Sequence, residues 1–400
     1  TNGSLITGDL IVDTGVSATA NITITGVAAV VSTDVHGILV DDGQIDGAIV
    51  NNGTIGALAL LSDHGDAYAD AWGILVDSGT DPSAINHGLG EATAQASGYD
   101  TAIARAFGIA QLASGTSEQA SVYSDGTITA EATAKSLTGD TDTLVDQAFA
   151  HVSGIAQTVL ALSTPHAVAT IGHGGTIHAH ASASAYDPLK SVYATAVDLG
   201  IEQVVQGPGA LADVSNDGTI DVSVESHAAS VAGNAHATSS ITGVNQLVVS
   251  SGTGGAATFV NEGDVNVESY GEAETDAAGG LAKSELLTGG AYQSDIGLDA
   301  DAVVDLTNAA LASIDVAATA HASGDVASAF AGAFGASQQA IVFQDDRSSA
   351  TADNSGRISA EGYATATGDD AWAGANVAGI NQLALSISGI ADTYLDNSGV

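Results

Sequence analysis

The chain of 400 residues contains no cysteine, no methionine and only six lysine or arginine residues. Without cysteine, neither a disulfide framework nor a thiolate zinc site can form. Six scattered cations cannot make the basic surface that a phosphate backbone requires, so we expect no nucleic-acid partner. Anionic membrane surfaces are disfavoured for the same reason. No apolar run approaches the ~20 residues that span a bilayer, so no transmembrane segment is expected.

Aromatic residues are also scarce, at 4% of the chain. Hydrophobic residues nevertheless make up 45%, which is more than a disordered chain contains. We therefore expect a folded protein whose core consists of Ala, Val, Ile and Leu. The 47 acidic residues give a net charge of −41. Such self-repulsion favours surroundings that are rich in salt or calcium.

Two independent sequence anchors recur along the chain. The first is an Asn or Asp two residues before a Gly, with copies that start at Asp13, Asn51, Asn86, Asn216, Asn261, Asn354 and Asn397 and degenerate copies at Ser124, His173 and Asn308. The second is Gly-Ile/Val-x-Gln, with glutamines at Gln111, Gln157, Gln203, Gln246 and Gln382, and with Gln293 and Gln338 in the same frame. Copies of the first anchor lie 35 to 49 residues apart, and the second follows the same period. The sequence therefore predicts about nine repeats in one continuous domain over 1–400, shorter in 1–123 and longer in 124–400.

Each repeat contains segments that alternate with period two. After Gly218, for example, Ile220, Val222 and Val224 alternate with polar residues, which is typical of a half-buried strand. A second strand leads into each Gly-Ile-x-Gln, and a third, shorter one precedes the next Asn. These patterns predict an all-β fold, a parallel β-solenoid (β-helix) with one three-strand rung per repeat. Two smaller turns per repeat remain an alternative at this point.

The two anchors have structural interpretations. Asn before Gly suits a corner, because Asn tolerates left-handed backbone and Gly adopts it without steric hindrance. Stacked Asn side chains can also bond along the rod. The seven glutamines occupy one repeat position, so we expect a ladder of stacked amides. A ligand groove lined by glutamine is the less favoured alternative.

Large side chains lie on the opposite face of the second strand from its alanines. They are Phe107, Phe149, Tyr193, Phe330, Phe334 and Trp372. We expect the third strand or loops to cover them. The alternative is an exposed apolar stripe that packs on a neighbouring molecule.

Carboxylates and histidines provide the candidate metal ligands. Two groups of aspartates share one spacing, namely Asp140, Asp142 and Asp146, and Asp299, Asp301 and Asp305. Oxygen ligands in loops suit Ca²⁺, although neither known calcium-loop pattern is complete, and a diffuse counter-ion role is the favoured interpretation. His178 and His180, with His173 upstream, could chelate a transition metal, but a solvated pair is expected.

Common catalytic motifs are absent from the sequence. It contains no Gly-x-Ser-x-Gly, no His-Glu-x-x-His and no phosphate-binding loop. A β-helix enzyme that acts on polysaccharides would use paired carboxylates, and Asp140, Asp142 and Asp146 would be the first candidates. We expect no catalysis and no resident cofactor, with Ca²⁺ as the one open alternative.

The repeat Asn354-Ser-Gly-x-Ile-x-Ala, followed by an alanine-alternating strand into Gly379-Ile-x-Gln, resembles a known family. It is similar to the repeats of large secreted surface proteins of Gram-negative bacteria, the autotransporter-passenger and haemagglutinin-like adhesins. The resemblance implies export to the bacterial cell surface, a β-solenoid shaft and adhesion or surface-structural work, and it implies no catalytic residues.

We therefore expect a non-enzymatic extracellular structural protein, the shaft or repeating subunit of an adhesin, filament or surface layer. Its partners would be copies of itself, stacked end to end or laterally, or host or cell-surface glycans and proteins. The alternatives are a lyase or glycosidase and a calcium-dependent glycan-binding module. Thr1 and the final anchor at Asn397 predict a mature or excised stretch of a longer protein, with an uncapped C-terminal rung.

Overall fold

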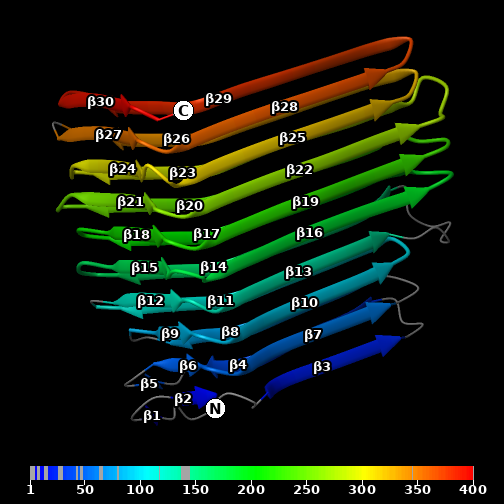
Figure 1. Ribbon diagram of the computed structural model, residues 1–400. Helices are drawn as coiled ribbons and strands as arrows, with labels where there is room; N and C mark the ends of the chain where they lie inside the picture. The colour runs from blue at the N-terminus through cyan, green and yellow to red at the C-terminus, as the bar shows by residue number, and fades with distance from the viewer. Residues whose placement is uncertain are drawn as a thin grey trace.

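The computed structural model describes residues 5–6, 10–12, 17–25, 30–41, 44–45, 48–62, 66–78, 81–116, 118–136, 145–344 and 346–399. Within these residues every regular element is a β-strand, and nearly all strands belong to three parallel sheets. The rungs stack along one axis, with the two chain ends at opposite ends of the stack (Figure 1). The all-β parallel solenoid that the sequence predicts is confirmed.

Sheet 1 contains the first strand of each rung. Its strands are β3 (Ser17–Thr25), β7 (Thr54–Ser62), β10 (Leu89–Gly98), β13 (Thr127–Ser136), β16 (Thr176–Asp187), β19 (Thr219–Ser230), β22 (Asp264–Thr275), β25 (Ser313–Ser323) and β28 (Arg357–Thr367).

Sheet 2 contains the second and longest strand of each rung. Its strands are β4 (Val30–Asp41), β8 (Asp66–Ser78), β11 (Thr101–Gly115), β14 (Val145–Ala161), β17 (Ser191–Gly207), β20 (Ala235–Ser251), β23 (Leu281–Leu298), β26 (Val326–Val342) and β29 (Asp370–Ser386).

Sheet 3 contains the short third strand. Its strands are β2 (Leu10–Val12), β6 (Ile49–Asn51), β9 (Ser83–Asn86), β12 (Gln119–Ser124), β15 (His166–Ile171), β18 (Leu211–Asn216), β21 (Gly255–Asn261), β24 (Ala302–Asn308), β27 (Arg347–Asn354) and β30 (Ile390–Asn397). A separate parallel pair joins β1 (Leu5–Ile6) to β5 (Gln44–Ile45).

One repeat of the sequence forms one rung of three strands. The chain passes from sheet 1 to sheet 2 to sheet 3, and then enters sheet 1 of the next rung, where equivalent residues pair in register. Gln203 pairs with Gln246, for example, and Asn216 with Asn261. The alternative of two smaller turns per repeat is therefore wrong. At ~4.8 Å per rung, nine rungs form a stack of about 40 Å.

Each long strand of sheet 2 faces both shorter sheets. In β17, Ala194 and Ala196 are buried before Gly200, whereas Ile201, Gln203 and Val205 are buried after it, so the alternation shifts by one residue at the glycine. The first half packs against sheet 1 and contributes to the larger core cluster. The second half packs against sheet 3 and forms a smaller cluster. A glycine at this point in every rung thus divides sheet 2 into two arms.

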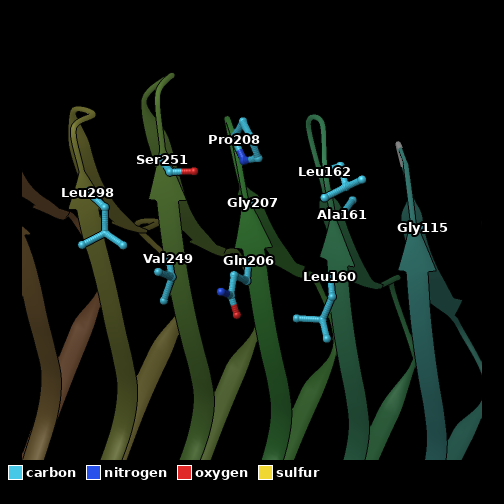
Figure 2. Close-up of a pocket in the computed structure, with 10 residues that line it drawn as sticks. All are labelled: Gly115, Leu160, Ala161, Leu162, Gln206, Gly207, Pro208, Val249, Ser251 and Leu298. Atoms are coloured by element: carbon cyan, nitrogen blue, oxygen red, sulfur yellow. The ribbon is translucent and has the colours of Figure 1, made fainter.

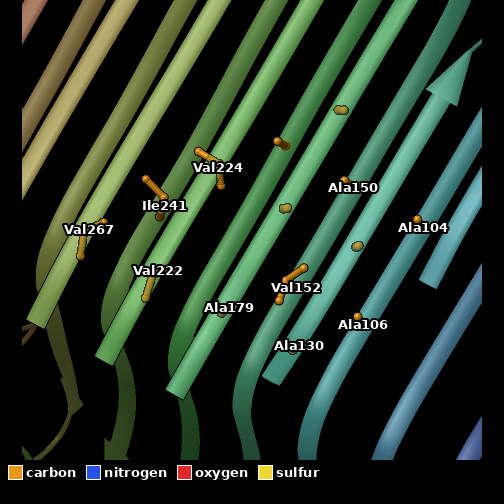
Figure 3. Packing of buried hydrophobic residues seen from close by; sticks show 14 of the residues in the cluster. Ala104, Ala106, Ala130, Ala150, Val152, Ala179, Val222, Val224, Ile241 and Val267 are labelled. Carbon is orange, nitrogen blue, oxygen red and sulfur yellow. The ribbon is translucent and has the colours of Figure 1, made fainter. Parts of the chain in front are cut away.

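The core consists mainly of small aliphatic residues. Alanine fills many of the inward positions of both facing sheets, and isoleucine accounts for most of the largest fully buried side chains. Figure 3 shows Ala104, Ala150 and Ala179 on neighbouring strands of this cluster, beside Val222 and Ile241. The predicted core of Ala, Val, Ile and Leu is confirmed.

Candidate functional site

The seven predicted glutamines form a continuous hydrogen-bonded ladder inside sheet 2. The Nε2 of each glutamine donates to the Oε1 of the glutamine in the preceding rung, at 2.9 to 3.0 Å, from Gln382 down to Gln111. Each Nε2 also donates to a backbone carbonyl of sheet 3. The side chains from Gln111 to Gln338 are at most 2% exposed. The ladder is confirmed, and the alternative of a glutamine-lined groove is wrong.

The predicted asparagines form a second ladder, which runs in the opposite direction. The Nδ2 of each residue donates to the Oδ1 of the asparagine in the following rung, at 2.7 to 2.9 Å. These bonds join Asn51 to Asn86, and Asn216, Asn261, Asn308, Asn354 and Asn397 in succession. The Oδ1 atoms of Asn51 and Asn216 also accept the backbone N–H two residues on, at 3.0 and 3.1 Å, which closes the corner. The predicted position of Asn at the corner is confirmed, but the left-handed backbone expected there is wrong, because neither Asn216 nor Gly218 has a positive φ. Glycine is required at Gly218 because a Cβ there would clash with the carbonyl oxygen of Gly175 in the preceding rung.

The asparagine ladder is interrupted in two rungs. Asn86 donates to the hydroxyl of Ser124, and the next position in register is Ile171, which has no polar side chain. The sequence pattern places the degenerate copy of this rung at His173, and that assignment is wrong. The turn between β15 and β16 is two residues longer than the turn after Asn216. Gly175 therefore stacks beside the anchor glycine Gly218 of the next rung, whereas His173 does not stack beside Asn216.

Replacing Gln246 with leucine is expected to destabilise its rung by about 2–4 kcal/mol. The substitution removes the amide that donates to Gln203, Ala212 and Thr258 and leaves the Nε2 of Gln293 without its ladder acceptor in a buried position. Hydrogen exchange of β17, β20 and β23 together with urea unfolding would measure the loss. Gln95→Leu on the exposed face of β10 is the control, and equal effects of the two substitutions would contradict a buried ladder.

The predicted calcium ligands are not assembled in the described part of the chain. Asp299 lies in a turn with φ of 62°, Asp301 accepts the backbone N–H of Arg347 at 2.8 Å, and Asp305 lies within β24. Four residues along a strand span about 13 Å, so Asp301 and Asp305 cannot converge on one ion. Within the described residues no group of three His, Cys, Asp or Glu side chains could hold a metal.

Asp140 and Asp142 of the other aspartate group lie outside the described residues, so calcium binding there stays a prediction. Asp146 is described and fully buried, and its Oδ1 lies 3.3 Å from the Nζ of Lys190. Lys190 also lies 3.7 Å from Asp100, which is one rung before Asp146 and two rungs before Lys190. Burial raises the pKa of Asp146 to about 7, although the lysine acts in the opposite direction. Asp146, Lys190 and Asp100 thus form a cluster of charged groups that links three rungs.

Two further buried carboxyls were missed by the sequence patterns. Asp295 points into the smaller core cluster, where it accepts the backbone N–H of Val303 at 2.9 Å, and burial raises its pKa to about 7. Asp198 points into the larger cluster between Val152 and Ile241 of the adjacent rungs. Neither of its carboxyl oxygens has a hydrogen-bond partner. Burial raises the pKa of Asp198 well above its usual value, and the nearby backbone amides of Leu199 and Ser223 offset this only in part.

The large side chains of sheet 2 stand on its outer face, where Phe107 is buried and Phe149, Phe330 and Phe334 are half-buried. Tyr193 is 39% and Trp372 is 56% exposed. The rings are covered in part by residues of neighbouring rungs, as in Trp72 against Phe107 and Tyr193 against His236, with ring centres 4.1 and 4.7 Å apart. The rings are thus covered within the molecule only in part, and the contacts come from neighbouring rungs of sheet 2, so the expected cover by the third strand is wrong.

The three candidate histidines lie on the outer face of sheet 1 or in the turn that leads into it. The Nδ1 of His178 lies 3.4 Å from a carboxyl oxygen of Asp221, and the Nδ1 of His180 lies 2.9 Å from the hydroxyl of Ser223. Both border an open groove of about 610 Å³, which Glu131 also lines. His173 is almost fully exposed in its turn. The solvated arrangement that the sequence favours matches these positions.

An apolar hollow lies at the far edge of sheet 2, where the chain turns into sheet 3. It has a volume of about 490 Å³, and Figure 2 shows Leu160, Gln206 and Val249 on successive long strands, with Leu162 and Leu298 near the turns. Apart from Gln206 and Ser251 the lining side chains are apolar, and none carries a charge.

Comparison with known proteins identifies no relative: no family model, no curated protein and no solved structure matches the chain. In the part of the chain that the structure describes, no helix is present that could cross a membrane.

Proposed function

We propose that the protein is a non-enzymatic extracellular structural protein, the shaft or a repeating subunit of a bacterial surface adhesin, filament or surface layer. The continuity of bonding between rungs carries the proposal. Backbone pairing in all three sheets, and the glutamine ladder within sheet 2, run in the direction in which the rungs stack. A load applied along the rod is then shared by many parallel hydrogen bonds, which suits a shaft.

The distribution of charge supports the same proposal. The outer face of sheet 1 carries carboxylates along most of its length, at Glu91, Glu131, Asp221, Glu225, Asp264, Glu268, Glu272, Glu274, Asp315 and Glu361. Such a surface holds a layer of water and counter-ions and keeps an exposed rod in solution. The partners in this proposal are further copies of the chain, or glycans and proteins at a cell surface.

Three measurements test the proposed function. A broad-specificity protease should leave the rod intact, because packed rungs hide the backbone, whereas an unfolded acidic chain would be digested. Antibodies against the chain should label unpermeabilised cells that produce it. The purified protein should release no reducing or unsaturated sugars from acidic or neutral glycans. Sugar release would favour the polysaccharide-acting enzyme instead, and rapid digestion or labelling only after permeabilisation would contradict the proposal.

A further inference from the structure

The outer face of sheet 2 differs from the outer face of sheet 1 in its charge. From β11 to β26, its charged side chains are Arg105, Glu202, Lys283 and Glu285, whose formal charges sum to zero. Lys283 lies 2.6 Å from Glu285, so these two neutralise each other locally. Burial raises the pKa of Glu202. In a chain with a net charge of −41, the formal charges on this broad face thus sum to zero.

The same face is apolar over much of its area. In the arm beyond the glycine column, one register position holds Leu160, Gln206, Val249, Ile296 and Ile341 in five successive rungs. The hollow of about 490 Å³ lies beside this row. In the other arm Tyr193, Phe330 and Leu287 project outward, and Leu287 is 52% exposed. These are the side chains that dominate protein interfaces when they are removed from water.

The partner that suits this face is one that shares the charge of the chain. A cationic partner would be attracted to the carboxylates of sheet 1, and it gains nothing from a neutral face. Two identical acidic rods repel each other on sheet 1, where carboxylates would meet, and can approach on sheet 2. Six rungs at ~4.8 Å and about 15 residues per strand at ~3.3 Å give an area of about 1,400 Å². This exceeds the ~800 Å² per partner of a standard interface.

We infer that two copies of this chain associate side by side through the outer faces of their sheets 2, with the row from Leu160 to Ile341 at the centre of the contact. The inference rests on the proposed structural function, because it takes a second rod as the partner. It goes beyond that function by naming the face. Like charges on the remaining surfaces would then keep the pair from growing into a disordered aggregate.

Sedimentation velocity of the purified chain at physiological salt tests the inference. We expect twice the mass of a single chain of 39.1 kDa, and an increase in the dimer fraction with added salt as the flanking carboxylates are screened. Val249→Glu combined with Ile296→Glu should reduce the mass to that of one chain, because both side chains lie in the central row. Val260→Glu combined with Val303→Glu adds the same charge on the outer face of sheet 3 in the same rungs and should leave the dimer intact.

Three outcomes would overturn the side-by-side pair. They are a wild-type protein that stays monomeric up to high concentration, an equal loss of dimer in both double variants, and end-to-end chains that the Val249/Ile296 variant still forms. None of these outcomes would contradict the proposed function, because a single protease-resistant rod at the cell surface remains a shaft. Conversely, a dimer that digests glycans would contradict the function and leave the pairing intact. Circular dichroism of both double variants confirms that the rungs are folded.

Discussion

Replacing Gly200 with alanine is expected to destabilise the rod by about 3 kcal/mol or more. A Cβ at this position would lie 2.5 Å from the carbonyl oxygen of Gly243 and 2.7 Å from the Cγ2 of Ile220. The first contact is with the backbone of the next rung, which cannot move without breaking the pairing of sheet 2. Gly108, Gly154 and Gly290 meet the same obstacle in their own rungs. Close backbone approach, not flexibility, requires glycine here.

Gly289→Ala is the matched control for this substitution. It lies one position before the equivalent glycine of β23, and a Cβ there would have no neighbour closer than 3.8 Å. Its effect on stability should stay below about 1 kcal/mol. Urea unfolding gives the overall change, and hydrogen exchange shows whether β17 and β20 lose protection first, because each rung contacts only its neighbours. Similar losses for the two variants would contradict a steric role for the glycine column.

The ladders could be predicted because a ladder requires the same residue type at the same register position in every rung. The recurring Gln of Gly-Ile-x-Gln and the recurring Asn before Gly therefore report directly on spatial neighbours. The error at His173 has a physical origin, since a turn can lengthen by two residues without moving the strands. Counting back two residues from Gly175 gives His173 as the anchor residue, but the residue that pairs with Asn216 is Ile171.

The calcium ligands show the opposite case. Regular spacing of aspartates along the sequence predicts that their carboxylates meet at one ion only where the chain forms a loop. Asp305 lies in an extended strand instead. The cover expected for Tyr193 and Trp372 failed for a related reason. Alternation places a side chain on one face of a strand, but it cannot tell which face another sheet covers. Sheet 3 packs on the same side as sheet 1, so the opposite face of sheet 2 stays open.

Asp198 carried a sequence signal that could have identified it. It stands two residues after Ala196 and two before Gly200, in the alternation that places alanines in the core. A carboxyl group at a position that alternates in step with these alanines is predicted to be buried. Whether it would find a partner depends on neighbouring rungs, and the aliphatic residues Val152 and Ile241 occupy its register positions there. Only the assembled rungs show that it is without a hydrogen-bond partner.

Replacing Asp198 with valine is expected to stabilise the protein by about 1–4 kcal/mol at neutral pH. The substitution removes a fully buried carboxyl without hydrogen-bond partners and supplies an aliphatic side chain of the kind found in the adjacent rungs. Urea unfolding of the two proteins side by side measures the gain. Asp353→Val is the control, because Asp353 is exposed on β27 and should change stability by less than about 0.5 kcal/mol.

The pH dependence of that gain separates a titrating carboxyl from simple repacking. The pKa of Asp198 is higher in the folded protein than its ordinary value of 3.8, so the folded state holds the proton more tightly than the unfolded state. Below about pH 4 the group is neutral in both states and carries no charge penalty. As the pH rises, the unfolded state ionises first, and the wild type loses stability until the pH passes the raised pKa of Asp198.

Asp146 and Asp295, whose pKa values are about 7, also lower the stability of the folded protein as the pH rises, and their contributions end near pH 7. The advantage of Asp198→Val should therefore be larger at about pH 8 than at about pH 5. An advantage that does not change with pH, or a variant less stable than the wild type, would show that Asp198 is not a buried, proton-binding group.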